Sequence, residues 1–250
     1  MRAAVAAIAL CATTARADVP WPRLVLDDDQ VEVAATLEVS IATAPFARPT
    51  SLAPDLWWGA TPRLTIGLTH SHASVDQIAA GASLCLRTAD LGCDRTYRGS
   101  NLDARYLVYE DHTVSVAPRA RLLLRDIDPV KPALTLGATA RWRHGRYAIA
   151  ADPYLQLGLY NRDKGNHAQL WLPVYLEVTV ACRWLVAAHV GWNSELIEVN
   201  DAWHLPLGGI VRVRATSFLD VGLEAGFSTL GGPQNNIKQR AAMFTVAWHD

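Results

Sequence analysis

Alternation of apolar and polar side chains constrains this chain more than any other feature of its sequence. The pattern is clearest in five stretches: 31–41, 114–125, 134–143, 170–180 and 219–228. A period of two places all apolar side chains on one face of a β-strand and the interleaved residues on the other. After residue 17, no stretch sustains the i, i+3, i+4, i+7 spacing of an amphipathic helix. The sequence therefore predicts an all-β protein.

Turn signals divide the alternating region into twelve expected strands. They lie at about 31–42, 54–60, 63–72, 99–109, 113–125, 132–142, 146–160, 168–180, 184–193, 203–214, 218–229 and 237–248. Many run to about eleven residues, as a tilted strand that crosses a bilayer requires, whereas soluble strands average about five or six. Short and long connections alternate between them. A closed, antiparallel, up-and-down transmembrane barrel fits these lengths better than the alternative, a soluble β-sandwich.

Composition narrows the class further. Half of the 250 residues are apolar, yet no stretch after residue 17 reaches 18 uninterrupted apolar residues, so a membrane-spanning helix is not expected. An apolar content this high also excludes a disordered chain. The formal net charge of −1 and the pI of about 6.7 lack the basic excess of a nucleic-acid-binding protein, and we expect no nucleic-acid partner.

The first residues have the form of an export signal. A basic start precedes an apolar run over residues 3–14, and Ala15-Arg16-Ala17 is a small-residue cleavage site. The domain prediction is therefore a secretory signal peptide at 1–17, a periplasmic leader at 18–30 and a barrel at 31–248.

The interleaved face of the expected strands carries arginine and carboxylate residues together, which can satisfy one another inside a narrow lumen. The residues predicted to face the lumen are Arg105, Arg119, Arg121, Arg141, Arg143, Asp152, Glu177, Arg212, Arg214, Asp220 and Glu224. Tryptophans fall instead near strand ends on the apolar face, where indole rings favour a bilayer interface. The predicted interfacial residues are Trp58, Trp142, Trp184, Trp192, Trp203 and Trp248.

These features resemble bacterial outer-membrane β-barrel proteins of the porin-like class. The last strand, Met243 to Trp248, is similar to the C-terminal recognition signal of that class, although His249 and Asp250 follow its aromatic residue. The resemblance implies a Gram-negative outer membrane, with the termini and short turns in the periplasm and the long loops outside. It also implies contact with outer-membrane lipid and lipopolysaccharide, and with the barrel-assembly machinery through the C-terminal strand.

Three cysteines follow the predicted cleavage site. Cys85 and Cys93 lie in the longest loop, and an oxidising compartment favours a disulfide between them, with Cys182 free. A metal site would need further ligands, and the spacing of His70 and His72 fits no zinc pattern, so no metal or cofactor is expected.

We predict a narrow passive channel for small polar solutes. Barrels of eight strands are filled by side chains, and those of sixteen enclose a channel. In a twelve-stranded barrel, the size of the inward side chains therefore decides whether the lumen is open. With arginines on the fifth and sixth strands and Asp220 and Glu224 on a facing wall, we expect a weak anion preference.

Two alternatives stay open. One is a non-conducting structural or adhesive barrel. The other is a membrane-embedded lipid acyl hydrolase that uses the region of His70, His72 and Ser74, because a nucleophilic hydroxyl beside a histidine is what acyl transfer requires. None of the established hydrolase or nucleotide-binding motifs occurs, so we assign no catalytic residue.

Overall fold

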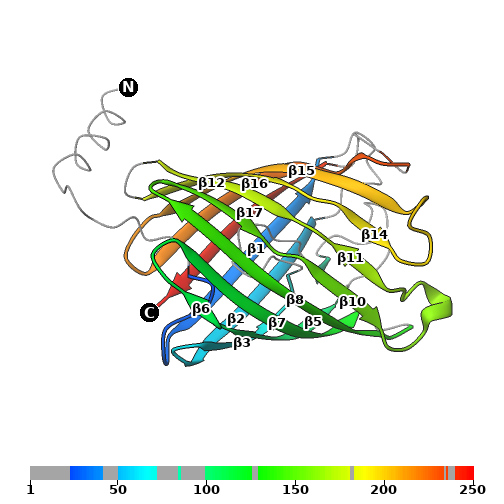
Figure 1. The fold of residues 1–250 in the computed structure, drawn as a ribbon, viewed down its shortest axis with the longest axis horizontal. Coiled ribbons are helices and arrows are strands. Elements are labelled where there is room, and N and C mark those ends of the chain that lie inside the picture. The colour runs from blue at the N-terminus through cyan, green and yellow to red at the C-terminus, as the bar shows by residue number, and fades with distance from the viewer. Residues whose placement is uncertain are drawn as a thin grey trace.

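The computed structural model is a single closed β-barrel (Figure 1). It describes residues 23–41, 50–71, 84–85, 99–125, 129–180, 183–233, 235 and 240–250. The strand segments are β1 Val31–Ser40, β2 Thr50–Thr61, β3 Leu64–Thr69, β4 Leu84–Cys85, β5 Ser100–Tyr106, β6 Tyr109–Glu110, β7 Val114–Arg125, β8 Lys131–His144, β9 Tyr147–Ala151, β10 Tyr154–Gly158, β11 Gln169–Trp171, β12 Val174–Val180, β13 Trp184–Val190, β14 Asn193–Glu195, β15 Trp203–Arg214, β16 Leu219–Gly231 and β17 Arg240–His249. A 3-10 helix, Arg162–Lys164, follows β10. In the described part of the chain, no helix is long and apolar enough to span a membrane.

These segments make twelve antiparallel strands, because five strands consist of two segments each. The pairs are β3 with β4, β5 with β6, β9 with β10, β11 with β12, and β13 with β14. The first strand closes the barrel against the last: every residue of β1 from Glu32 to Ser40 pairs with a residue of β17. The closed, up-and-down antiparallel barrel expected from the sequence is confirmed.

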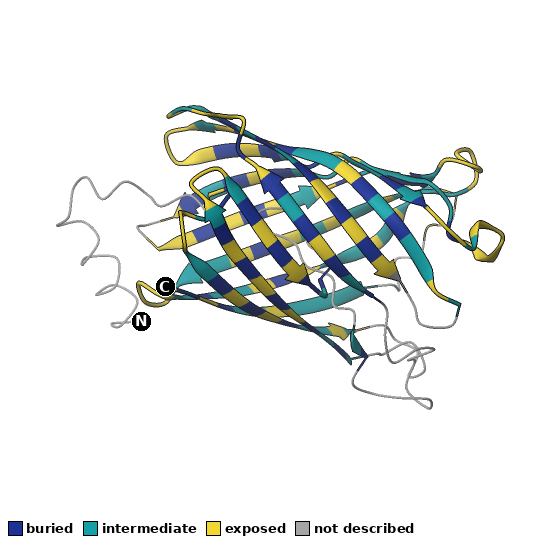
Figure 2. Ribbon diagram, turned by 90° about the horizontal axis from the view of Figure 1, so that it is seen from below, coloured by how far each residue is buried: buried dark blue, intermediate teal, exposed yellow. Residues whose placement is uncertain are grey.

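Burial alternates along the strands in step with the sequence (Figure 2). Leu102, Leu176 and Leu223 on the outer face are 54–57% exposed, whereas their polar neighbours along the strand, such as Asp103 and Glu177, are about 1% exposed. A soluble protein would hide such a continuous apolar outer surface, but a lipid-facing barrel requires it.

The predicted interfacial tryptophans lie on the outer face at the two ends of the barrel. Trp58, Trp142, Trp184 and Trp248 are 43–47% exposed and lie close to the short turns. Trp192 and Trp203, near the opposite end, are partly exposed. Trp57 differs from its neighbour Trp58: it is 1% exposed and faces the interior, an orientation that the alternation of β2 requires.

Three expected long strands are interrupted where the chain has proline or glycine. The breaks fall at Asp152-Pro153, Leu172-Pro173 and Gly191-Trp192. Proline has no backbone N–H to donate, so it disrupts the regular ladder. Irregular hydrogen bonds bridge the breaks, with the N–H of Asp152 donating to the carbonyl of Pro173 and that of Ala138 to Pro153, both at 3.1 Å.

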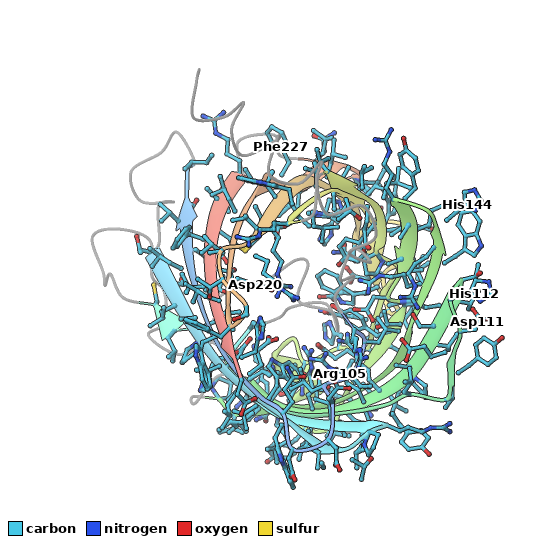
Figure 3. The ribbon with its side chains drawn as sticks, turned by 90° about the vertical axis from the view of Figure 1, so that its left-hand side faces the viewer. Arg105, Asp111, His112, His144, Asp220 and Phe227 are labelled. Atoms are coloured by element: carbon cyan, nitrogen blue, oxygen red, sulfur yellow. The ribbon has the colours of Figure 1, made fainter. Side chains whose placement is uncertain are left out.

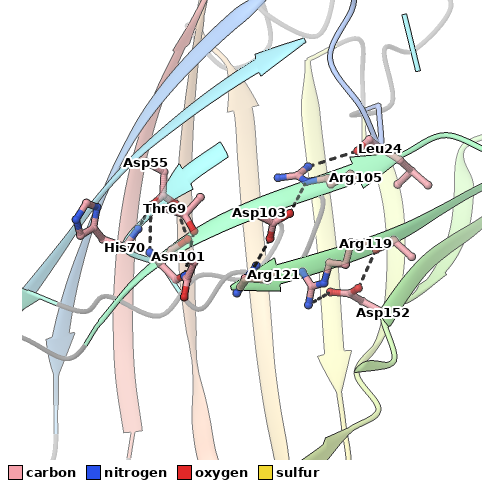
Figure 4. Close-up of polar contacts among 12 residues, drawn as sticks. Leu24, Asp55, Thr69, His70, Asn101, Asp103, Arg105, Arg119, Arg121 and Asp152 are labelled. Atoms are coloured by element: carbon pink, nitrogen blue, oxygen red, sulfur yellow. Dashed lines mark hydrogen bonds and ion pairs between the residues drawn. The ribbon is translucent and has the colours of Figure 1, made fainter. Parts of the chain in front are cut away.

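The first segment of the third strand, β3, is shorter than expected and ends at Thr69 instead of residue 72, and the strand resumes as β4. The Asp55 carboxylate accepts hydrogen bonds from the N–H groups of His70, at 2.7 Å, and Ser71, at 3.0 Å, and also from the Ser71 hydroxyl. Asn101 donates to the carbonyl of Ser71 at 3.1 Å (Figure 4). Side chains thus replace the backbone hydrogen bonds that residues 70–71 would make in a continuous strand. Beyond the end of β3, β4 pairs with β2 instead.

The assignment of the two faces predicts opposite effects of a new charge. Leu136, on the outer face of β8 midway along the strand, is 45% exposed. Leu136→Arg should lower the free energy of unfolding by about 2–4 kcal/mol, because it places a charge in hydrocarbon. Urea titration of the protein in lipid vesicles, followed by tryptophan fluorescence, measures this cost.

Met243→Arg is the matched control. Met243 faces the lumen and pairs with Glu224 on one side and Glu38 on the other, so an arginine there gains two acidic neighbours. It should cost much less than Leu136→Arg. Equal costs would show that the two faces have been assigned wrongly.

Candidate functional site

The lumen collects the ionisable side chains of the barrel. Of the predicted lumen residues, eight are buried in the interior: Arg105, Arg119, Arg121, Arg141, Asp152, Glu177, Asp220 and Glu224. Arg143, Arg212 and Arg214 are partly exposed. Figure 3, a view from one end, places Arg105 and Asp220 on the inner side of the ribbon and Asp111, His112 and His144 on its outer side.

One wall of the lumen, from β5 to β12, holds a chain of ion pairs. Asp103 is central: its carboxylate lies 2.7 Å from Nε of Arg121 and 3.8 Å from Nε of Arg105 (Figure 4). The Arg105 guanidinium also stacks on Trp57, with Cζ 3.6 Å from a ring centroid. The Arg105 charge is therefore held between a carboxylate and an aromatic face, both favourable partners for a desolvated cation.

The same wall continues with two further pairs. Arg119 Nη2 lies 3.5 Å from Asp152, which also accepts a hydrogen bond from the Thr139 hydroxyl at 2.8 Å. Arg141 Nε lies 3.1 Å from Glu177. All four ionised groups are at most 4% exposed, so each arginine is neutralised by a carboxylate of its own wall.

The opposite wall, from β13 to β17, has its own pairs. Asp220 lies 2.9 Å from Nη2 of Arg212 and 3.1 Å from Nε of Arg214. Glu224 lies 3.6 Å from Nδ1 of His189. The arginines of β7 and β8 and the carboxylates Asp220 and Glu224 of β16 thus lie on opposite walls, but each wall also carries partners of the opposite charge. These partners lie on the same strand or on strands one or two places apart in the sheet, where opposite charges approach to 4 Å or less, which a partner across the lumen cannot do.

The two walls differ in the size of their side chains. The β5–β12 wall carries the long arginines together with Tyr154, Trp171 and Tyr175. On β16, β17 and β1 the inward positions are mostly short: Gly222, Gly226, Thr245, Ala247, Ala34 and Thr36. A cavity of about 370 Å³ of empty space, open to solvent, lies against this second wall. It is lined by Ile210, Arg212, Asp220, Gly222, Leu223, Glu224, Thr245 and Ala247.

The segment before β1 packs inside the barrel over β2, β3 and β5. Leu24 and Val25 are 2% and 4% exposed, and the Leu24 carbonyl accepts a hydrogen bond from Arg105 at 3.4 Å. The Leu26 N–H donates to Thr65 Oγ1 at 2.8 Å. A Cβ at Gly59 would lie 1.8 Å from the Asp27 carbonyl oxygen, so this close approach requires glycine. This segment is part of the expected leader at 18–30.

Arg143 lies at the short-turn end of the lumen and ties β8 to the turn after β6. Its Nη2 donates to the Asp111 carbonyl at 3.0 Å and lies 3.7 Å from Glu110. The Tyr109 hydroxyl and the backbone N–H groups of Val114 and Thr113 donate to the Asp111 carboxylate. These bonds lower the pKa of Asp111 to about 2, so the turn keeps its negative charge in moderately acidic solution.

The candidate hydrolase residues are only partly described. His70 Nδ1 lies 2.7 Å from the Pro54 carbonyl, whereas Ser71 is buried on the opposite, inward side of the strand with Asp55. His72 and Ser74 lie outside the described residues. No group of three or more His, Cys, Asp and Glu side chains in the described ranges is arranged to hold a metal ion.

Cys85 in β4 is disulfide-bonded. Its expected partner, Cys93, and the expected free thiol, Cys182, lie outside the described residues, as do residues 1–22 with the predicted signal peptide. The pairing of Cys85 with Cys93 stays a prediction.

Several interior residues were not among the sequence candidates. Asp103 is the centre of the ion-pair chain, and Trp57 covers Arg105. Trp171 stacks on Tyr154, with ring centroids 5.7 Å apart. All three alternate with outward apolar residues of their expected strands, so the period-two pattern would have placed them inside.

Solved structures of bacterial outer-membrane channels share this fold. The NanC porin matches with a TM-score of 0.61 at 8% identity, over 87% of this chain and 98% of that chain. The KdgM porin in complex with disordered oligogalacturonate matches with a TM-score of 0.58 at 8% identity, over 87% and 98%. An outer membrane channel from Pseudomonas putida F1 matches with a TM-score of 0.56 at 11% identity, over 95% and 100%.

No protein-family model and no curated protein sequence matches the chain. At identities this low, the likeness shows a shared fold. That fold is the porin-like β-barrel of bacterial outer-membrane proteins.

The ion-pair chain predicts a large stability cost for removing one partner. Arg121→Ala leaves Asp103 buried without its nearest cation and should destabilise the barrel by about 3–5 kcal/mol. Glu110→Ala, which removes the exposed partner of Arg143, should cost about 1 kcal/mol or less. Urea unfolding in lipid vesicles compares the two, and similar costs would contradict a buried, tightly coupled Asp103–Arg121 pair.

Proposed function

We propose that the protein is a narrow passive channel for small polar solutes in a bacterial outer membrane. The observation that carries the proposal is the solvent-open cavity inside a closed barrel, lined by ionisable and small side chains. An apolar outer surface and an ionisable interior fit a barrel that separates lipid from an aqueous path.

The fold supports the proposed location. Porins and outer-membrane channels share the barrel, and its closed sheet leaves no edge strand exposed to hydrocarbon. In this location the outer face contacts outer-membrane lipid and lipopolysaccharide. The C-terminal strand β17, which closes the barrel, is then the segment that the assembly machinery receives.

The solute is a small polar molecule rather than a strongly acidic polymer. The KdgM porin was solved with oligogalacturonate, a polyanion. In this chain, Arg119, Arg121 and Arg141 are at most 5% exposed and lie beside carboxylates, so they offer little free positive charge to an anion. We therefore expect these arginines to contribute little to the weak anion preference that the sequence suggests.

A non-conducting structural barrel is the second candidate. The observation that favours it is the packing of the β5–β12 wall, where long side chains and the segment before β1 fill part of the lumen. The hydrolase alternative gains no such support: His70 contacts the Pro54 carbonyl, and His72 and Ser74 lie outside the described residues.

Conductance separates the two candidates. The refolded protein should produce discrete steps of current in a planar lipid bilayer, smaller than those of a sixteen-stranded porin recorded in the same salt, because its lumen is narrower. Protein that has been denatured and not refolded, added to the same bilayer, serves as the negative control. Insertion without current steps would favour the structural barrel.

Loop accessibility tests the proposed orientation. An epitope inserted in 161–167, at the long-loop end, should be cleaved by protease added to intact cells, because long loops face outward in such barrels. An epitope at 145–146, in the turn between β8 and β9, should be cleaved only after the outer membrane is opened. The reverse pattern would contradict the orientation.

A further inference from the structure

We propose that residues 23–30, the described part of the segment before β1, form a constriction that sets the largest solute the channel admits. This inference rests on the proposed channel function and names the element that limits the width of the pore. The segment enters the lumen at the short-turn end and lies against the inner faces of β2, β3 and β5.

Two inward-facing glycines shape the wall beneath this segment. Gly59 lies near the end of β2, where a Cβ would be 1.8 Å from the carbonyl oxygen of Asp27. Gly67 of β3 makes the corresponding room for the Trp57 ring, which would lie 2.1 Å from a Cβ at that position. The glycines therefore bring the segment and the Trp57 ring close to the backbone of β2 and β3, and a larger residue at 59 would displace the segment.

Hydrogen bonds fix the point at which the segment enters the lumen. The N–H of Asp29 donates to the carbonyl of Gly59, and the Gly59 N–H donates to the carbonyl of Gln30, both at 2.8 Å. The Gln30 side chain accepts from the N–H of Asp27 at 3.2 Å and donates to the carbonyl of Asp250, which follows β17, at 3.1 Å. Contacts with both strands beside β1 thus set the direction in which residues 23–26 leave this turn.

Beyond the turn, burial holds the segment against the wall. Leu24 and Val25 are buried, whereas a chain free in a water-filled lumen would expose both apolar side chains, so their burial favours the seated position. The N–H of Leu26 donates to Thr65 Oγ1 at 2.8 Å, and Arg105 donates to the Leu24 carbonyl at 3.4 Å (Figure 4). Apolar contact and hydrogen bonds therefore act together on three consecutive residues.

The seated segment takes a large share of the lumen. A barrel of twelve strands, spaced about 4.8 Å apart and tilted by about 40°, has a backbone diameter of about 24 Å. A layer of chain packed on a sheet takes up to about 10 Å of that width, and inward side chains take part of the rest. At its short-turn end, the width of the pore therefore depends on whether the segment is seated.

Gly59→Ala tests the constriction. Its Cβ cannot share its position with the Asp27 carbonyl oxygen, so the segment should leave its seat. The single-channel conductance in a planar bilayer should then exceed that of the wild type in the same salt. In a liposome-swelling assay, the rate of entry of a neutral trisaccharide relative to that of a pentose should also rise.

A second variant and a matched control accompany this substitution. Leu24→Ser removes a buried apolar side chain without altering any strand, and it should raise the conductance as Gly59→Ala does. Gly209→Ala makes the same glycine substitution on the outer face of β15, where the nearest atom to a Cβ is 4.0 Å away. Its conductance should equal that of the wild type. Circular dichroism and the heat-induced gel shift establish that each variant is folded.

Thiol labelling reports the position of the segment independently of current. Val25→Cys, made in a Cys182→Ser background, places a thiol at a position that is 4% exposed. This thiol should react slowly with a maleimide in the folded, vesicle-inserted protein. It should react much faster when Gly59→Ala or Leu24→Ser is added, because either change unseats the segment.

The outcomes separate the constriction from the channel function. If the wild type conducts, and both variants expose the Val25→Cys thiol without raising the conductance, the constriction is overturned and the channel stands. A Val25→Cys thiol that reacts as fast without the second substitution as with it overturns the seat itself. If neither the wild type nor the variants conduct, although labelling shows that the segment has moved, both the constriction and the proposed function are overturned.

Discussion

A strand that crosses hydrocarbon must find a hydrogen-bond partner for every backbone N–H and C=O group, and the architecture of this barrel depends on that requirement. The pairing of β1 with β17 meets it at the last open edge. Once the sheet is closed, each strand has one face toward lipid and one toward the lumen. The period-two sequence then divides the side chains between them: leucine and valine outside, arginine and carboxylate inside.

Enclosing many charges creates a second requirement, because an unpaired buried charge is expensive. Adjacent strands provide the solution: Asp103 on β5 meets Arg121 on β7, and Arg212 on β15 meets Asp220 on β16. Each interior arginine of the β5–β12 wall thus has a carboxylate beside it, with Asp103 shared by Arg105 and Arg121. The long side chains gather on this side of the barrel, and a solvent-open cavity lies beside Gly222 and Thr245 on the other.

Much of the fold follows from alternation and turn signals. Strand number, direction and closure could be predicted because they depend on local patterns that repeat along the chain. Pro153 and Pro173 also indicate where their strands are interrupted, because proline has no N–H to donate to a neighbouring strand. The shortening of β3 could not be foreseen, because it depends on Asp55, which is near His70 and Ser71 only after the hairpin has formed.

The sequence allowed us to predict which residues face the interior, but not which of them are in contact with one another. Parity places Arg119, Arg121 and Arg141 inside, yet their partners depend on the register and tilt of neighbouring strands, which alternation alone does not specify. For this reason the expectation of facing charged walls did not include the carboxylates that lie beside these arginines. The packing of Leu24 and Val25 inside the barrel could not be predicted from the sequence, because an isolated apolar pair before a strand shows no periodic pattern.

The central claim is that the lumen arginines are neutralised within their own wall. The reversal potential of the wild-type channel across a potassium chloride gradient tests it most directly. Our account predicts a value near zero. A large displacement in the direction of chloride would contradict it, because such selectivity requires arginines whose charge is available to the permeating ions.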